Sequence, residues 1–301
     1  MARIYALYGN PVAHSLSPAF QQAGLDRLGV DAAYELRRVE AAGLTAAAQQ
    51  LRVGGIAGAN ITVPYKRLAV DLADLASPVA HSVGAANTWC VREGQLAAFN
   101  TDAGGLRVAL ELLGLSASKR AVVLGSGGAA NAAAFALAGT SVAVIARDIS
   151  AAAAVYTESQ ALRRCALWGS SAASSLLREA DLIVDATSLA HSPLATAEAA
   201  YASLGLGVVS SSAAVYSLSY GLGLAPLRAA LGPRVALHDG LSMLLLQGAL
   251  SLRLWTGEHP PISEMCKALQ TAAQRPLTWS DQLDGPEREA HVIALLENVA
   301  V

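Results

Sequence analysis

The most constraining feature of this sequence is a glycine turn between two apolar runs, Gly125-Ser-Gly127-Gly128-Ala129. A β-branched run precedes the turn from residue 121, and an alanine-rich stretch of helical length follows it. A second β-branched run then ends at Arg147. This order predicts a strand, a turn, a helix and a second strand, which together form a βαβ unit. An α/β fold with a parallel sheet is therefore expected here.

The spacing of the glycines suits a dinucleotide. Gly125 and Gly127 let the backbone turn tightly and approach a pyrophosphate, and Gly128 or Ala129 lets the helix pack close to the strand. The N-terminus of the helix then faces the anion. A tight turn of this kind also occurs in α/β proteins that bind no nucleotide. The strand before it and the helix after it favour the nucleotide site.

Length and composition limit the remaining possibilities. A chain of 301 residues with 53% hydrophobic and 15% charged residues exceeds the usual size of a single core, so two domains are expected. A net charge of −2 gives no positive surface potential that would attract nucleic acid or an anionic membrane. A small-molecule partner is therefore expected. Cys90, Cys165 and Cys266 lie far apart and suggest neither disulfides nor a metal site. With no secretory signal pattern, a cytoplasmic location is expected.

Two long uncharged tracts, residues 121–146 and 200–227, are long enough to suggest membrane spans. A spanning helix needs about 20 apolar residues without a break. Glycine and asparagine interrupt the first tract, and serine and glycine interrupt the second. We therefore expect buried parallel strands joined by turns in both tracts, and no membrane partner.

Polar residues follow several predicted strands in the first third of the chain. Ser15 and Ser17 lie in a loop between a strand at residues 4–8 and a helix that starts near Pro18. Their hydroxyls suit a ligand that carries oxygens, although Ser17 also qualifies as a simple helix cap. Lys66 is expected at the start of a helix after Pro64, where it either reaches a cleft or is solvated.

A β-hairpin is predicted from residue 84 to residue 105, with its turn at 93–94. Asn87 precedes the first strand, and Asn100 and Asp102 follow the second, just before a pair of glycines. Asn100 and Asp102 either line a site or cap the next helix.

Taken together, the motifs resemble those of the shikimate dehydrogenases in order and spacing, over about residues 4 to 262. The matching segments are Gly9-Asn-Pro-Val-x-His-Ser-Leu-Ser-Pro18, Asn60-Ile-Thr-Val-Pro-x-Lys66, Gly84-Ala-x-Asn87-Thr88, Asn100-Thr-Asp102, Gly125-x-Gly-Gly-Ala-Ala130, Asp239-Gly-Leu-x-Met-Leu-Leu-x-Gln247-Gly-Ala249 and Trp255-Thr-Gly257.

The resemblance implies an α/β protein of two domains. Residues 1–104 would form an N-terminal substrate-binding domain, and residues 105–238 a doubly wound Rossmann-type dinucleotide-binding domain. C-terminal helices in residues 239–301 would return to the first domain. The segment beyond residue 261 contains helical stretches and runs past the usual end of the family.

The resemblance also implies an activity, the NAD(P)H-dependent reduction of 3-dehydroshikimate to shikimate. Ser15 and Ser17 match residues that hold the substrate carboxylate. The other implied substrate-binding residues are Thr62, Asn87, Tyr220 and Gln247. Lys66 and Asp102 match the catalytic pair. Reduction of a ketone creates an alkoxide that needs a proton donor within about 3 Å, which Lys66 can supply while Asp102 orients it.

The implied cofactor is NADP, with NAD possible. The implied contacts are Gly125, Gly127, Gly128, Ala129, Arg147, Asp148, Thr187 and Gly240. Ala146-Arg147-Asp148 stands where the family has Asn-Arg-Thr, which grips the 2′-phosphate. An acid at this position favours an unphosphorylated ribose, unless Asp148 caps the next helix and points away. Downstream, Asp185-Ala-Thr187 replaces the family's Asn-Ala-Thr.

Two alternatives to shikimate dehydrogenase activity stay open at this point. One is a relative that uses quinate or another cyclic hydroxy acid. The other is a degenerate member that binds the ring acid without turning it over, because several residues of the cofactor lobe depart from the family pattern. The protein is expected to be a monomer or a homodimer.

Overall fold

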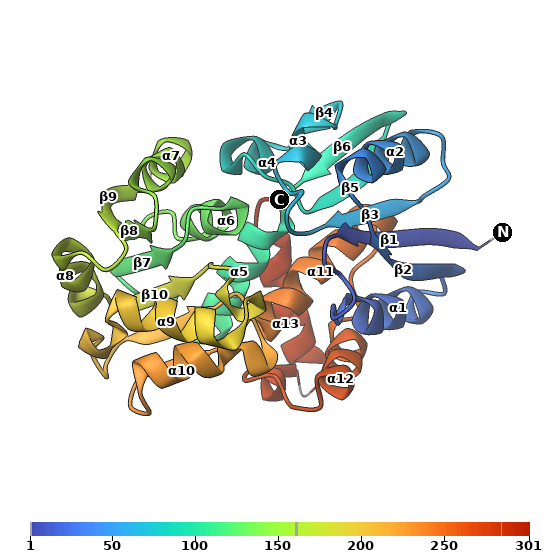
Figure 1. Cartoon of the computed structure of the whole chain (residues 1–301). Helices are drawn as coiled ribbons and strands as arrows, with labels where there is room; N and C mark the ends of the chain where they lie inside the picture. Colours follow the sequence, from blue (N-terminus) through green and yellow to red (C-terminus); the bar gives the residue numbers. More distant parts are fainter. Residues whose placement is uncertain (1, 160–161, 284) are drawn as a thin grey trace. The chain divides into compact units, whose positions relative to one another are not determined.

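The structure is a computed structural model that describes residues 2–159, 162–283 and 285–301. The chain divides into two compact units (Figure 1). Unit 1 consists of Met1–Ala109 and Ser242–Val301, and unit 2 of Leu110–Leu241. Each unit contains a sheet covered by helices, which confirms the α/β fold with a doubly wound second part. The expected boundaries after residues 104 and 238 lie close to this division, and the roles of the two domains stay predictions.

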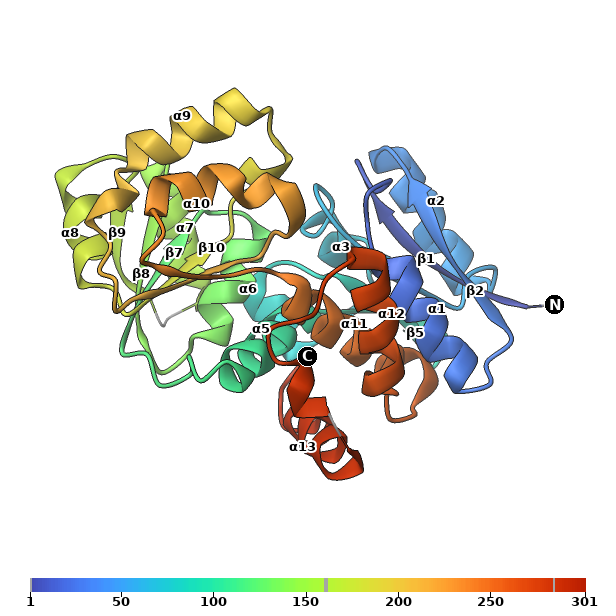
Figure 2. The ribbon, with the colours of Figure 1, turned by 90° about the horizontal axis from the view of Figure 1, so that it is seen from below.

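Unit 1 alternates strands and helices through most of its length. Its elements are β1 (Arg3–Gly9), α1 (Ser17–Arg27), β2 (Ala32–Arg38), α2 (Ala41–Arg52), β3 (Gly58–Ile61), α3 (Leu68–Asp71), β4 (Leu75–Ala76), α4 (Pro78–Val83), β5 (Thr88–Arg92), β6 (Gln95–Phe99), α5 (Thr101–Leu112), α11 (Leu241–Thr256), α12 (Ile262–Ala273) and α13 (Pro286–Glu297). Helices α12 and α13, and α11 from Ser242 onward, lie in unit 1 with the N-terminal elements, and α12 packs against α1 (Figure 2). Helices α5 and α11 each cross the boundary between the units.

Strand directions in unit 1 bring several loops to one edge of the sheet. Among the described residues the strand order is β2-β1-β3-β5-β6-β4. Strands β1 and β3 are parallel, β5 is antiparallel to both β3 and β6, and so the carboxyl ends of β1, β3 and β6 meet the start of β5. The loops that carry the polar motifs of the sequence all leave from this edge.

Helices α5 and α11 approach each other closely because a glycine faces the contact. A Cβ atom at Gly105 would lie 2.7 Å from the backbone nitrogen of Gln247, too close for any side chain. Residues near the C-terminus also reach α5, since a Cβ at Gly104 would lie 3.0 Å from the side chain of Val299. Close helix packing thus brings Gln247 next to the first turns of α5.

Unit 2 has the alternating pattern predicted from its glycine turn. Its elements are β7 (Arg120–Leu124), α6 (Gly128–Ala136), β8 (Ser141–Ala146), α7 (Ile149–Ser159), β9 (Leu162–Leu167), α8 (Ser171–Glu179), β10 (Leu182–Asp185), η1 (Leu189–His191), α9 (Leu194–Leu204), η2 (Leu206–Val208), β11 (Ala214–Ser217), η3 (Gly221–Leu224), α10 (Ala225–Leu231) and β12 (Ala236–His238). The predicted hairpin of unit 1 and the βαβ unit of unit 2 are both confirmed.

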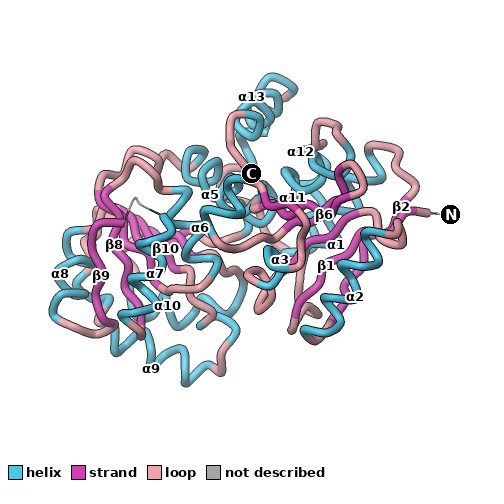
Figure 3. The backbone as a smooth tube through the Cα atoms, turned by 90° about the horizontal axis from the view of Figure 1, so that it is seen from above, coloured by secondary structure: helices cyan, strands magenta, loops and turns pink. Residues whose placement is uncertain are grey.

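The sheet of unit 2 runs in the order β12-β11-β10-β7-β8-β9 over the part of the chain that is described, and its strands pair in parallel. Helices cover both faces of these strands (Figure 3). Strand order reverses between β7 and β10. In open α/β sheets a ligand binds outside the carboxyl ends of the strands at such a reversal.

The expectation for residues 200–227 is wrong. This tract contains the end of α9, the single strand β11 and the start of α10, rather than several strands. Alanine and leucine favour helix, and Gly205 ends α9 in a left-handed conformation with φ 73°. No helix among the described residues is both long enough and apolar enough to cross a membrane.

Candidate active site

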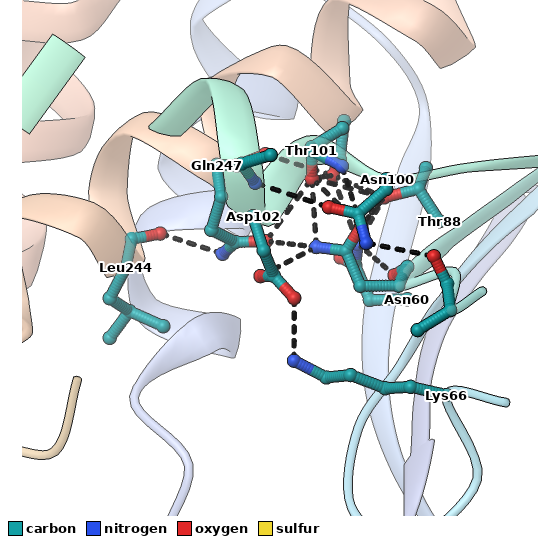
Figure 4. Close-up of polar contacts among 12 residues, drawn as sticks. Asn60, Lys66, Thr88, Asn100, Thr101, Asp102, Leu244 and Gln247 are labelled. Atoms are coloured by element: carbon teal, nitrogen blue, oxygen red, sulfur yellow. Dashed lines mark hydrogen bonds and ion pairs between the residues drawn. The ribbon is translucent and has the colours of Figure 1, made fainter. Parts of the chain in front are cut away.

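The centre of the candidate site is an ion pair between Lys66 and Asp102 (Figure 4). The Lys66 Nζ lies 2.6 Å from Asp102 Oδ2, and the two side chains are 17% and 6% exposed. Lys66 lies in the turn that precedes α3, whereas the sequence predicted it at the start of the helix itself. Its carbonyl accepts a hydrogen bond from the backbone nitrogen of Ala86 at 2.8 Å, which ties this turn to the loop before β5.

Asn87 joins the ion pair to two other elements. Its Nδ2 lies 2.9 Å from Asp102 Oδ1, 2.8 Å from Thr101 Oγ1 and 3.0 Å from Gln247 Oε1. Its Oδ1 accepts from the backbone nitrogen of Thr101 at 2.7 Å. Both oxygens of Asp102 are thus held by donors, one by Lys66 and one by Asn87, which fixes the direction of the carboxylate.

Asn100 and Asp102, both predicted as possible caps of the next helix, have different roles in the structure. Asn100 Oδ1 accepts from the backbone nitrogen of Ala103 at 3.1 Å and caps α5, while its Nδ2 donates to the carbonyl of Ala85 at 2.8 Å. Asp102, in the first turn of the same helix, points to Lys66 instead. Capping is therefore confirmed for Asn100 and wrong for Asp102.

A buried polar layer supports the site, and one of its members was missed from the sequence. Ser251 is fully buried on α11, and its Oγ lies 2.8 Å from Thr88 Oγ1 and 3.2 Å from Thr101 Oγ1. Asn60 Nδ2 donates to the same hydroxyl at 3.0 Å. Ser251 lies one helical turn after Gln247, on the same face, which was the available signal.

Tyr34 closes this layer on the far side of Asn60. Its hydroxyl donates to Asn60 Oδ1 at 2.8 Å, and burial raises the pKa of Tyr34 well above its usual range. The phenol therefore stays a neutral donor, and the amide of Asn60 is held with its oxygen towards the tyrosine.

Ser15 and Ser17 lie together, at the same sheet edge as the ion pair. Ser15 Oγ accepts from the backbone nitrogen of Ser17 at 3.2 Å and lies 3.1 Å from Ser17 Oγ. The N-cap of α1 is Leu16, without a side-chain hydrogen bond, so the interpretation of Ser17 as the cap is wrong. Thr62 follows β3, and its backbone nitrogen donates to the carbonyl of Tyr8 at 2.9 Å.

Direct hydrogen bonds connect Lys66, Asn87, Asp102 and Gln247. Within the described residues, no hydrogen bond connects Ser15, Ser17 or Thr62 to that group. The two sets therefore lie at the same sheet edge without a direct hydrogen bond between them among the described residues.

In unit 2, the glycine turn fits the phosphates of a dinucleotide. Gly125 has φ 112°, a conformation that favours glycine. Gly127 is the N-cap of α6 without a side-chain hydrogen bond, and a Cβ atom there would meet nothing within 4 Å. The backbone nitrogens of the first turn of α6, including Gly128 and Ala129, can therefore receive an anion.

The two residues after β8, Arg147 and Asp148, differ in their contacts. Asp148 Oδ1 accepts from the backbone nitrogens of Ser150 at 2.8 Å and Ala151 at 3.2 Å, which makes Asp148 the cap of α7. Arg147 is exposed beside it. The prediction that Asp148 caps the next helix is therefore confirmed. Two backbone N–H groups partly neutralise its carboxylate.

Three other predicted residues lie after strands of the same sheet. Thr187 follows β10 and donates to Asp185 Oδ1 through both its nitrogen, at 3.1 Å, and its hydroxyl, at 2.7 Å. Gly240 follows β12, and its nitrogen donates to the carbonyl of Ser219 at 2.9 Å. Tyr220 is the next residue after Ser219, in the turn that follows β11.

Comparison with known proteins shows the family of this chain. The family model described as the shikimate dehydrogenase substrate binding domain matches residues 7–89, and the model of the shikimate 5′-dehydrogenase C-terminal domain matches residues 240–270. The shikimate dehydrogenase (NADP(+)) of Haloarcula marismortui is 34% identical over 277 residues, covering 87% of this chain and 96% of the relative. The chain belongs to the shikimate dehydrogenase family. The predicted family is therefore confirmed.

Solved structures of similar proteins cover nearly the whole chain. The shikimate 5-dehydrogenase of Thermus thermophilus, in complex with NADP(H) and shikimate, is 35% identical with a TM-score of 0.74, and the match covers 90% of this chain and 99% of that one. The 5-ketofructose reductase of Gluconobacter sp. strain CHM43 is 27% identical with a TM-score of 0.73, with 90% and 99% covered. The chain thus resembles both a shikimate 5-dehydrogenase and a 5-ketofructose reductase in structure.

Proposed function

We propose that the protein is an NADP-dependent oxidoreductase that interconverts 3-dehydroshikimate and shikimate. The observation that carries the proposal is the Lys66–Asp102 pair, held at 2.6 Å and flanked by Asn87 and Gln247, in a member of the shikimate dehydrogenase family. The names of the relatives and the ligands of the Thermus thermophilus structure support the substrate and the cofactor.

Unit 1 would hold the ring acid. The hydroxyls of Ser15 and Ser17 would donate to its carboxylate, as two neighbouring donors suit an anion. Thr62, Asn87 and Gln247 would contact its ring hydroxyls, and Tyr220 stays a predicted substrate contact. Each of these side chains except Tyr220 belongs to the sheet edge described above or to α11.

The dinucleotide would be held by unit 2. Its phosphates would lie at the N-terminus of α6, over Gly127 and Gly128, and Arg147 would attract the 2′-phosphate. Because Asp148 is engaged in capping α7, its charge opposes that attraction less than a free carboxylate would. When bound, the nicotinamide supplies the hydride for the ketone carbon.

Lys66 then completes the reduction. As the ketone carbon gains two electrons with the hydride, its oxygen becomes an alkoxide, and Lys66 Nζ gives it a proton. Asp102 keeps the ammonium directed, because one carboxylate oxygen is 2.6 Å from Nζ while Asn87 holds the other. In the reverse direction the neutral amine accepts the proton from the shikimate hydroxyl.

Replacing Lys66 tests the assignment. Lys66→Ala is expected to lower turnover of 3-dehydroshikimate with NADPH by about 100-fold or more, while shikimate affinity stays within about tenfold, because the proton donor acts mainly in the transition state. NADPH absorbance measures turnover, and calorimetry measures affinity. Arg67→Ala, which removes the exposed neighbouring cation, is the matched control and is expected to keep wild-type rates. A Lys66→Ala enzyme with more than a tenth of the wild-type rate would show that another group is the acid.

A panel of substrates separates the alternatives. Shikimate and quinate carry a carboxylate for Ser15 and Ser17, whereas 5-ketofructose carries none. Turnover of quinate in preference to shikimate would support the alternative substrate, and binding of shikimate without any dinucleotide binding would support the non-catalytic alternative. We also propose a cytoplasmic monomer or homodimer, and light scattering of the purified protein tests the oligomeric state.

A further inference from the structure

The C-terminal segment, residues 286–301, lies beyond the residues that the two family models match, and it belongs to unit 1. It consists of α13 and the residues that follow it. Glu289 of α13 accepts a hydrogen bond from the backbone nitrogen of Ser263 at 3.0 Å, and Glu297 Oε1 lies 3.2 Å from His259 Nδ1. Contacts near both ends of α13 thus fix where the chain leaves this helix.

The end of this segment lies against α5 (Figure 2). A Cβ atom at Gly104 would lie 3.0 Å from Val299 Cγ2 and 3.3 Å from the carbonyl oxygen of Ala300. It would also lie 3.0 Å from Leu250 Cδ1 of α11. Gly104 is therefore buried under side chains of the C-terminal segment and of α11, and a larger residue there would have to displace one of them.

Glycine at this position weakens the helix that carries Asp102. Gly104 and Gly105 follow each other in α5, and glycine is a poor helix former because it loses the most backbone freedom on folding. Gly105 makes room for Gln247, and Gly104 makes room for Val299. The start of α5 therefore depends on packing against α11 and the C-terminal segment more than on its own helix propensity.

Asp102 lies on the opposite face of the same turn. Successive residues of an α-helix are rotated by about 100°, so Asp102 and Gly104 point about 200° apart. Asp102 faces Lys66 at 2.6 Å, whereas Gly104 faces Val299. Val299 thus packs behind the turn that carries the carboxylate. A displacement of about 1 Å at a reacting group can lower a rate by about 100-fold.

We infer that Val299 is a positioning residue for the proposed reaction: it packs against α5 at Gly104 and so keeps the Asp102 carboxylate in place beside Lys66. The inference rests on the proposed function. It gives the C-terminal segment a part in turnover that is exerted through Asp102 rather than through contact with the substrate.

Steady-state kinetics of Val299→Ala, with shikimate and NADP⁺ as substrates, test the inference. The variant loses both γ carbons, so the start of α5 loses its support at Gly104. We expect kcat to fall about fivefold, with KM for both substrates within twofold of wild type. Val299→Ile keeps both γ carbons and is expected to keep kcat within about twofold. Asn298→Ala, which shortens the exposed neighbouring side chain, is the matched control and is expected to keep wild-type kinetics.

The same substitution in an Asp102→Asn background separates positioning from stabilisation. Because Val299 acts through Asp102, adding Val299→Ala is expected to leave kcat within about twofold of that of Asp102→Asn alone. A merely structural role would lower the melting temperature in both backgrounds and leave kcat of the folded Val299→Ala protein unchanged.

The outcomes are distinct. Wild-type kcat in Val299→Ala, with both proteins folded by circular dichroism, overturns this inference and leaves the proposed function intact. A loss of kcat that is repeated in full in the Asp102→Asn background does the same. A wild-type protein without turnover overturns the proposed function, and the inference with it. If Val299→Ala does not fold, Gly104→Ala decides, because its Cβ would press against Val299: kcat lowered about two- to fivefold with unchanged KM supports the inference, and wild-type kcat overturns it.

Discussion

The variant Asp102→Asn tests how much the ion pair with Lys66 contributes to the stability of unit 1 and to turnover. Exposed ion pairs contribute about 0–1 kcal/mol, and breaking a buried pair costs about 3–5 kcal/mol. With Lys66 17% exposed and Asp102 6% exposed, water reaches the lysine in part, so Asp102→Asn is expected to destabilise unit 1 by about 2–3 kcal/mol. The same change is expected to lower kcat about 100-fold, because the ammonium loses its orientation.

A double-mutant cycle with Lys66→Ala measures the coupling. Since Asp102 acts through Lys66, the double variant is expected to lose no more kcat than Lys66→Ala alone, and less stability than the two single changes added together, by at least about 1 kcal/mol. Additive losses in both kcat and stability would refute the proposed pairing.

Tryptophan fluorescence in urea can follow unit 1 for this measurement. Trp89, Trp255 and Trp279 belong to unit 1, and Trp168 belongs to unit 2. Trp168→Phe as the common background therefore leaves a signal from unit 1 alone. Its own turnover must match wild type before the cycle is built on it.

Two further predictions concern the ligands. Ser15→Ala combined with Ser17→Ala is expected to weaken shikimate binding by about 2–4 kcal/mol, the size of two charge-assisted hydrogen bonds, and unchanged affinity by calorimetry would remove the carboxylate assignment. Asp148→Thr keeps a capping oxygen for α7 and removes a negative charge beside Arg147, so the ratio of NADP to NAD affinity is expected to rise by about tenfold at low salt. A ratio that does not change would mean that this carboxylate lies too far from the 2′-phosphate to matter.

The sequence predicted the parts of the fold that depend on local pattern. The strand, glycine turn, helix and strand from residue 121 to residue 146 were recognised because β-branched runs, glycines and alanines each favour one local structure. Residues 200–227 were predicted wrongly because short uncharged runs look alike in a buried strand and in a buried helix. Their structure depends on packing against the rest of unit 2.

The candidate site divides in a similar way. The resemblance to the shikimate dehydrogenases pointed to Lys66 and Asp102, which hydrogen-bond across 36 positions of sequence, whereas the residues alone left Lys66 either in a cleft or solvated. The pattern did not distinguish Asn100 from Asp102 as the cap, because both lie at the start of the same helix and only their tertiary partners differ. Ser251 was missed because its one signal, a position one helical turn after Gln247, does not reveal the three polar side chains that contact it.

The division of unit 1 into two separated segments has a consequence for synthesis. The amide of Asn87 and the hydroxyl of Thr88 have partners in Gln247 and Ser251, which leave the ribosome long after them. At about 5–20 residues per second, the interval between residues 102 and 251 lasts roughly 7–30 s. Unit 2, a continuous stretch, can complete its own hydrogen bonds during that wait. The candidate site is thus assembled only after unit 2 has been synthesised. A nascent chain passes through a stage in which unit 2 is folded and unit 1 still lacks α11, which carries Gln247 and Ser251.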